Sequence, residues 1–239
     1  MIKTHTMLED QYTAIEAAMK RIKHAVGKDD GRGWVQYIRV ERNGNHDSMI
    51  ATDGHRLVCL HLDFEAEHSP ASIHPTTDPR DPLSWRADAY WPDWQHLLPR
   101  SNFAVRVVRR ALITAVSEVK QVFDGYNRER RAQHRQAIKA CTTRADRSNL
   151  QKAGPQEAAW VPVQFDADRM SVRFANIGRE VEVDGPDVLG EKMGINPKYL
   201  LEALRAMKGK LVTLAYTDPR SPLKITGDDG FELVLPCRM

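Results

Sequence analysis

The residues that could do acid–base or phosphate chemistry are few in this chain and poorly placed for it. Asp53 and His55 lie two residues apart, but no serine or cysteine is placed to complete a catalytic triad with them. Gly31 and Gly33 flank an arginine without the Gly-x-x-x-x-Gly-Lys-Ser/Thr pattern of a phosphate loop. The sequence therefore predicts a binding protein without enzyme activity.

Metal and redox chemistry is not indicated either. The three cysteines are far apart and form no Cys-x-x-Cys pair: Cys59, Cys141 and Cys237. Three histidines fall in or beside a proline-rich stretch that holds no fixed ligand geometry: His61, His68 and His74. We expect no disulfide framework, no metal site and no cofactor.

The remaining composition is that of a globular domain. No apolar run reaches membrane-spanning length, and the N-terminus MIKTHTMLEDQY lacks the apolar core of a secretory signal. A cytoplasmic protein with no membrane partner is the expectation. The 239 residues are enough for one large or two small domains.

The last 45 residues predict a complete structural unit, a helix followed by three strands. Asn196 is a candidate N-cap before Pro197, the residues Leu200, Leu204 and Met207 form an apolar stripe, and Gly209 ends the helix. Alternating apolar residues then predict strands over 212–216, 223–225 and 231–235.

The same order is predicted twice more. A helical stripe runs from Leu8 to Val26 and precedes strands over 34–41, 49–52 and 56–62. A second helix is expected from a cap at Ser101, with strands after it over 160–165, 170–175 and 180–183; its stripe is Val105, Val108, Leu112, Ala115 and Val119. The fold class is therefore α+β, built from repeated units of a helix and three strands.

Two segments fall outside this pattern. Residues 63–99 hold prolines at 70, 75, 79 and 82 without sustained periodicity, which predicts a linker. Residues 122–158 are polar and basic and are expected to be partly helical and partly disordered. Between Ala104 and Lys152 there are twelve Lys or Arg and four Asp or Glu, which gives a local charge of +8. Such a block is either a solvated helix face or a surface that attracts phosphates.

Five collinear stretches resemble one known family. They are ATDGHRL (51–57), WPDWQHLLP (91–99), NPKYLLEALRAM (196–207), TDPRSPLKI (217–225) and LVLPCRM (233–239). Their order and spacing are similar to those of the bacterial DNA polymerase III beta subunit, the sliding clamp. The resemblance implies a clamp fold with helices on one side and sheets on the other. It also implies that the family's first domain and half of its middle domain are missing.

The resemblance further implies the domain boundaries. Residues 1–62 would be half a clamp domain, 63–99 a proline-rich linker, and 100–239 a complete clamp domain with a basic insertion at about 122–158.

In clamps, polymerases and repair proteins dock a glutamine-, leucine- and phenylalanine-containing peptide into an apolar pocket. The positions that match this pocket are Thr52, Gly54, His55, Arg56, Leu57, Pro92, His96, Leu97, Tyr199, Pro222, Leu233, Leu235, Pro236, Cys237 and Arg238. The leucines would form its floor, while Arg56, His96 and Arg238 would form polar edges. His96 stands where the family usually has arginine, and Leu235 and Cys237 stand where methionine is usual.

The resemblance also implies contact with double-stranded DNA without base readout. The candidate DNA-facing residues are Lys20, Lys23, Arg106, Arg110, Lys198, Arg205 and Lys208. Three interpretations stay open. The first is a homo-oligomeric ring that encircles DNA as a processivity factor. The second is a non-encircling decoy or adaptor, of the kind a phage or mobile element would encode, that captures clamp-binding motifs or modulates a host clamp, and the third is a basic DNA-binding module that only keeps the fold.

Overall fold

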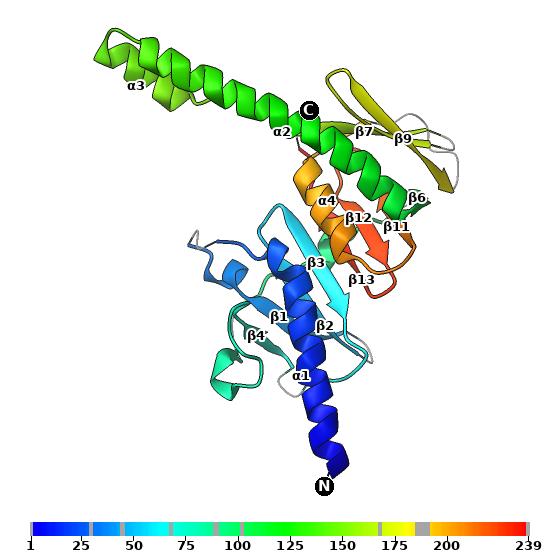
Figure 1. Cartoon of the computed structure of the whole chain (residues 1–239). Helices are drawn as coiled ribbons and strands as arrows, with labels where there is room; N and C mark the ends of the chain where they lie inside the picture. The colour runs from blue at the N-terminus through cyan, green and yellow to red at the C-terminus, as the bar shows by residue number, and fades with distance from the viewer. Residues whose placement is uncertain are drawn as a thin grey trace.

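The computed structural model shows helices in front of a long curved sheet (Figure 1). It describes residues 2–28, 31–43, 46–66, 69–87, 91–100, 103–166, 169–184 and 192–237. The predicted cap Ser101, the pocket residue Arg238 and the side chain of Leu8 lie outside the described part.

The C-terminal unit has the predicted form. It consists of α4 (Pro197–Ala206), β11 (Leu211–Tyr216), β12 (Leu223–Gly227) and β13 (Gly230–Val234). The Asn196 side chain accepts a hydrogen bond from the Lys198 amide at 3.0 Å, which caps the helix N-terminus. At the other end, Arg109 donates to the carbonyl oxygens of Gly209 at 2.7 Å and Leu204 at 3.2 Å. Both ends of the short helix are therefore satisfied.

The middle unit begins differently from the prediction. Residues Phe103–Val108 form strand β6, and the helix α2 (Arg109–Ala140) starts only after it. The prediction of a helix from residue 101 is therefore wrong for Val105 and Val108, although Leu112, Ala115 and Val119 are buried on α2 as expected. The stretch FAVRVV alternates between buried and exposed positions, which is the two-residue period of a strand. The helical spacing of Val105 and Val108 from Leu112 is a coincidence over too few residues to decide the structure.

The rest of this unit follows the predicted strand order. After α3 (Arg144–Ala153) come the predicted strands, as β7 (Val161–Asp166), β8 (Arg169–Phe174) and β9 (Ile177–Asp184); a further strand that the sequence does not predict, β10 (Lys192–Ile195), then precedes α4. Strand β10 pairs with β7, while β6 pairs with β11. Each of these two repeats is thus a strand, a helix and three strands. The first strand of the second repeat pairs with the first repeat, and β6 lies between β9 of its own repeat and β11 of the other. This pairing joins them into one domain.

The N-terminal unit is a single repeat. It contains α1 (Ile2–Ile22), the short turns η1 (Lys23–Ala25) and η2 (Gly33–Gln36), and strands β1 (Ile38–Asn43), β2 (His46–Thr52) and β3 (Arg56–His61). The predicted helix and the second and third strands are confirmed here, whereas the first strand begins only at Ile38 because residues 34–36 belong to the turn η2.

The described residues of the segment 63–99 form more regular structure than a linker would. It contributes β4 (Ala71–Ile73), which pairs with β1, and β5 (Trp85–Arg86), which pairs with β4; two turns, η3 (Pro82–Ser84) and η4 (Gln95–Leu97), complete it. Ala71 and Ile73 are buried. The linker prediction is wrong for this stretch because tertiary pairing fixes short strands that carry little local signal. Strand β4 lies against β1 as β10 lies against β7.

The strands form one sheet in the order β10-β7-β8-β9-β6-β11-β12-β13-β3-β2-β1-β4-β5. Helices α1, α2 and α4 cover one face of it, with Ile22, Leu112 and Leu204 fully buried beneath them (Figure 1). A smaller apolar cluster lies apart from this main core: Ile50, Leu57, Cys59, Trp94, Phe231 and Leu233. No helix in the described part is long and apolar enough to cross a membrane.

Gly230 makes the closest backbone approach at the β3–β13 junction. Its φ is +154°, and a Cβ there would collide with the carbonyl oxygen of Cys59. We expect Gly230→Ala to lower the free energy of unfolding by about 1–3 kcal/mol, measured by urea denaturation.

The matched control is Gly125→Ala in α2, where a Cβ meets no atom within 4 Å. It should raise the free energy of unfolding by up to about 1 kcal/mol, since alanine is the better helix former. Equal effects of the two substitutions would show that the junction tolerates a side chain.

Candidate functional site

A cavity opens on the β3–β13 junction beside the smaller apolar cluster. It encloses about 240 Å³. Leu57 and Leu233 lie directly opposite each other in the register of β3 and β13, so their side chains share one face of the sheet. The full lining is Trp34, Thr52, Gly54, Arg56, Leu57, Trp91, Pro92, Asp93, Trp94, His96, Leu97, Leu233 and Leu235.

The turn between β2 and β3 forms one edge of the cavity and is held by its own side chains. The Asp53 carboxylate accepts from the amides of His55 at 2.9 Å and Arg56 at 3.1 Å. The Thr52 hydroxyl donates to the Arg56 carbonyl at 2.6 Å. Gly54 has φ +87°, and a Cβ there would press on the guanidinium of Arg32. The turn is therefore rigid before any ligand arrives.

The connector around residues 91–98 forms the opposite wall. Trp94 is 5% exposed, donates from Nε1 to Glu41 at 3.0 Å, and lies 5.9 Å from the ring of Phe231. Trp91 meets Trp34 edge to face at 5.4 Å. These aromatic contacts fix the connector against the sheet, so the wall is preformed.

The C-terminal tail closes the third side. The amide of Leu235 donates to the His55 carbonyl at 3.0 Å, and that of Cys237 donates to the Gly194 carbonyl at 2.8 Å. Leu235 stays 36% exposed. The tail thus runs beside the loop of Gly54 and leaves an apolar side chain open to solvent.

Arg56 holds the two units together from the helix side of the junction. Its guanidinium contacts Asp53 at 3.0 Å, Glu202 of α4 at 2.5 Å and the carbonyl oxygen of His24. It also lies 4.4 Å from the ring of Tyr199. Because the Arg56 side chain is only 5% exposed, its charge interacts mainly with groups inside the protein. Arg56 lines the cavity, where it was expected to form a polar edge, and its guanidinium is already paired with groups of the protein itself.

A buried acid–base pair lies next to Arg56. His24 Nε2 is 3.0 Å from Glu232, whose side chain is fully buried. Burial alone would lower the pKa of His24, but the hydrogen bond and charge of Glu232 outweigh it and raise that pKa above 6.5. Burial raises the pKa of Glu232 above 4.5, against the opposing effects of His24 and Arg56.

Nine of the predicted pocket residues line the cavity: Thr52, Gly54, Arg56, Leu57, Pro92, His96, Leu97, Leu233 and Leu235. His55 and Tyr199 do not line it but stack on each other at 6.2 Å. Pro236 and Cys237 continue the tail, and Pro222 lies in the β11–β12 turn away from the cavity lining.

Four lining residues escaped prediction: Trp34, Trp91, Asp93 and Trp94. Three of them fall in the stretch WPDWQHLLP, where two tryptophans three residues apart were a usable signal. Trp34 lies in η2, and only the tertiary fold brings it to Trp91.

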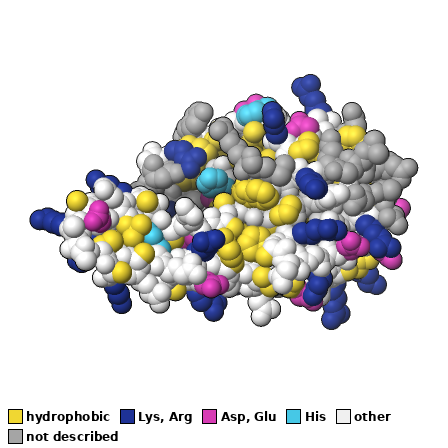
Figure 2. Space-filling view, turned by 90° about the horizontal axis from the view of Figure 1, so that it is seen from above, with side chains coloured by type: hydrophobic (Ala, Val, Ile, Leu, Met, Phe, Trp, Pro, Cys, Tyr) yellow, Lys and Arg dark blue, Asp and Glu magenta, His cyan; other side chains and the backbone are white. Residues whose placement is uncertain are grey.

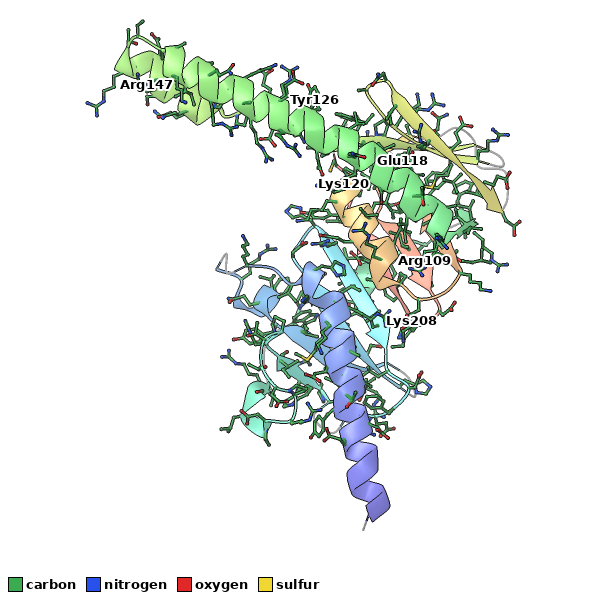
Figure 3. All side chains as sticks on the ribbon, in the orientation of Figure 1. Arg109, Glu118, Lys120, Tyr126, Arg147 and Lys208 are labelled. Carbon is green, nitrogen blue, oxygen red and sulfur yellow. The ribbon has the colours of Figure 1, made fainter. Side chains whose placement is uncertain are left out.

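The predicted DNA-facing cations have mixed positions. Lys20, Lys23, Arg110, Lys198 and Arg205 are exposed on α1, η1, α2 and α4. Lys208 follows α4 and lies 3.2 Å from Asp229 (Figure 3). Arg106 is exposed on strand β6, so its expected place on a helix is wrong.

The described residues contain no group of three or more His, Cys, Asp or Glu side chains arranged to hold a metal ion. Burial raises the pKa of the Cys59 thiol to about 12, which keeps it protonated and unreactive.

The His24–Glu232 pair predicts a pH-dependent stability. Since both folded-state pKa values are raised, the folded protein binds more protons than the unfolded chain, and the stabilisation is complete only at low pH. We expect the free energy of unfolding to fall as pH rises from 4.5 through 6.5 and past the folded pKa of His24.

Urea unfolding between about pH 5 and pH 8 measures this slope. Glu232→Gln should make it shallower, because it removes the carboxylate that pairs with His24. An equally steep slope in Glu232→Gln would assign the pH dependence to other groups.

Part of this chain is similar in sequence to a known protein family. Residues 137–237 match the family model described as DNA polymerase III beta subunit, C-terminal domain. No curated protein is similar enough in sequence to match the chain.

Solved structures of DNA polymerase III beta subunits, the sliding clamps, are among those that match. The DNA polymerase III beta subunit of Thermotoga maritima has 18% sequence identity and a TM-score of 0.68, over 96% of this chain and 64% of its own. That of Pseudomonas aeruginosa has 18% identity and a TM-score of 0.70, over 96% of this chain and 65% of its own. A P. aeruginosa sliding clamp bound to griselimycin has 18% identity and a TM-score of 0.67, over 96% of this chain and 64% of its own.

The chain therefore spans 64–65% of the length of these clamps. The fold prediction, repeated units with helices on one side and sheet on the other, is confirmed. Residues 137–237 are similar to the C-terminal domain of the DNA polymerase III beta subunit, and nearly the whole chain has the sliding-clamp fold.

Proposed function

We propose that this protein is a non-enzymatic, clamp-like binding protein whose cavity takes a short apolar peptide from a DNA polymerase or repair protein. The observation that carries the proposal is the preformed apolar cavity at the β3–β13 junction. Tryptophan, leucine and proline side chains make up most of its lining.

The cavity chemistry suits a buried leucine or phenylalanine. Full burial of one such side chain contributes about 1.5–3 kcal/mol. The walls of the cavity are held by the Asp53 turn, the tryptophan contacts and the hydrogen bond of the Leu235 amide. Few side chains of the cavity therefore have to become ordered when a peptide binds. The indole nitrogen of Trp91 is buried without a hydrogen-bond partner in the described part, and it offers a donor to a peptide carbonyl.

Leu97 and Leu235 are the cavity residues best suited to a binding test, because they are 38% and 36% exposed. A carboxylate at both positions would leave charges unpaired against an apolar ligand. We expect Leu97→Asp/Leu235→Asp to weaken binding of a fluorescent Gln-Leu-Phe-containing peptide by about 100-fold, at about 1.4 kcal/mol for each factor of ten, in an anisotropy titration.

The matched control is Leu83→Asp, at a leucine that is 91% exposed and outside the cavity. It should bind the peptide as the parent protein does. Binding that survives the double substitution, or that Leu83→Asp weakens equally, contradicts the assignment of the cavity.

DNA encirclement as a processivity factor is a second candidate function. It is favoured by exposed cations on the helix layer: Lys20, Lys23, Arg110, Lys198 and Arg205. Such a layer would face the phosphates of double-stranded DNA if copies of the chain closed into a homo-oligomeric ring.

The mass of the particle in solution tests this candidate. If the protein forms a ring, light scattering should give the mass of a closed oligomer. That oligomer should stay bound to circular duplex DNA and dissociate when the DNA is linearised. A monomer at high protein concentration, with and without DNA, would contradict the ring. Peptide binding by that monomer would support the decoy or adaptor interpretation in its place.

A further inference from the structure

The helix α2 extends far beyond the sheet that its first half covers. Its residues after Phe123 and the following α3 form an arm, here defined as residues 124–153, that projects away from the body (Figures 1 and 3). Arg147 lies near its far end (Figure 3).

The base of the arm is fixed to the body. Asn127 donates to the Ala158 carbonyl at 3.0 Å and accepts from the Ala158 amide at 2.8 Å. Arg131 pairs with Glu157 at 2.6 Å, and the rings of Phe123 and Tyr126 both pack edge to face on Phe174. The arm therefore leaves the domain in a defined direction.

Beyond this base the arm has almost no apolar core. None of the residues of α3 is buried, and Asn127 is the last buried residue of α2. A protein partner would need apolar or aromatic anchors at the centre of the contact, and the arm beyond Tyr126 offers no aromatic residue. Its character is electrostatic: residues 128–153 contain eight Lys or Arg and two acidic residues.

Four of these cations lie on one line. Arg128, Arg131, Arg135 and Lys139 follow each other at spacings of three and four residues, which places them on one side of α2 over about 17 Å. Helical periodicity places this side opposite the buried face of Leu112, Val119 and Phe123, and in line with Arg110. The cations therefore face away from the sheet.

Most of this charge is uncompensated. In the described part of the chain, only Arg131 of the four has an acidic partner, Glu157. A view from above shows Lys and Arg side chains around the protruding arm (Figure 2). A solvated face of a helix usually mixes both signs, whereas this line carries four cations after a single acidic residue at its base, Asp124, which pairs with Lys120.

We propose that the arm binds the phosphate backbone of double-stranded DNA without reading its sequence. The cations stand about one helical turn apart on a rigid rod, so several can engage successive phosphates at once. The contact adds to any binding by the helix layer, and it requires neither a closed ring nor a peptide in the cavity.

The test is a fluorescence anisotropy titration of the full chain with a linear duplex of about 30 base pairs, roughly three turns of DNA. Arg128→Ala/Arg135→Ala/Lys139→Ala removes three unpaired cations and keeps good helix formers in place. At about 0.1 M salt we expect at least tenfold weaker binding, and a salt slope smaller by about 0.9 for each lost phosphate contact.

The matched control removes three exposed cations outside the arm, by Arg169→Ala/Arg173→Ala/Arg220→Ala. It lowers the net charge equally and should change the affinity less than twofold. Circular dichroism of both variants checks that the helix content is kept.

Three results would overturn the proposal. The first is no measurable binding of the parent protein to the duplex at low salt. The second is an equal loss of DNA affinity in the arm variant and in the control variant. The third is tighter binding of the protein to an acidic polypeptide than to the duplex. The peptide titration of the cavity should give the same affinity in both variants, which separates this proposal from the proposed function.

Discussion

The antiparallel pairing of β3 with β13 is the constraint on which the rest of the structure depends. It joins residues 56–60 to residues 230–234, segments separated by most of the chain. Because side chains alternate along a strand, this one register sends Leu57 and Leu233 to one face and Arg56 and Glu232 to the other. The apolar cavity and the buried charge cluster are therefore two consequences of the same pairing, and a slip by one residue would destroy both.

The charge cluster on the helix side adds fixed polar contacts between two units whose apolar side chains already share one main core. Buried ion pairs contribute little net stability, but breaking one partner away is costly, so they favour a single arrangement. Arg56 reaches Glu202 of α4, and Arg21 of α1 donates to the Ala206 carbonyl at the end of the same helix. Together with the Arg21–Asp229 pair at 2.5 Å, these contacts tie α1 to the C-terminal unit. The cavity on the opposite face keeps its shape as a result.

The surfaces that carry the proposals lie on different layers of the molecule. The cavity lies on the sheet, against the connector with Trp91 and Trp94, whereas the cations of α1, α4 and the arm lie on the helix layer. A bound peptide and a bound nucleic acid would therefore not compete for the same side chains. This separation follows from the two-layer architecture, in which each sheet face is covered by a different kind of element.

The sequence by itself determined the elements with strong local signals. The cap and stripe of α4 and the strands of the first and last units were predictable, and nine of the cavity residues could be named from the resemblance. The tertiary structure decided what local periodicity leaves open. Phe103–Val108 is a strand because β11 and β9 flank it, and Ala71–Ile73 is a strand because β1 is available to pair. It also decided that Arg56 is buried and that Trp34 meets Trp91, since both depend on segments that only the folded chain brings together.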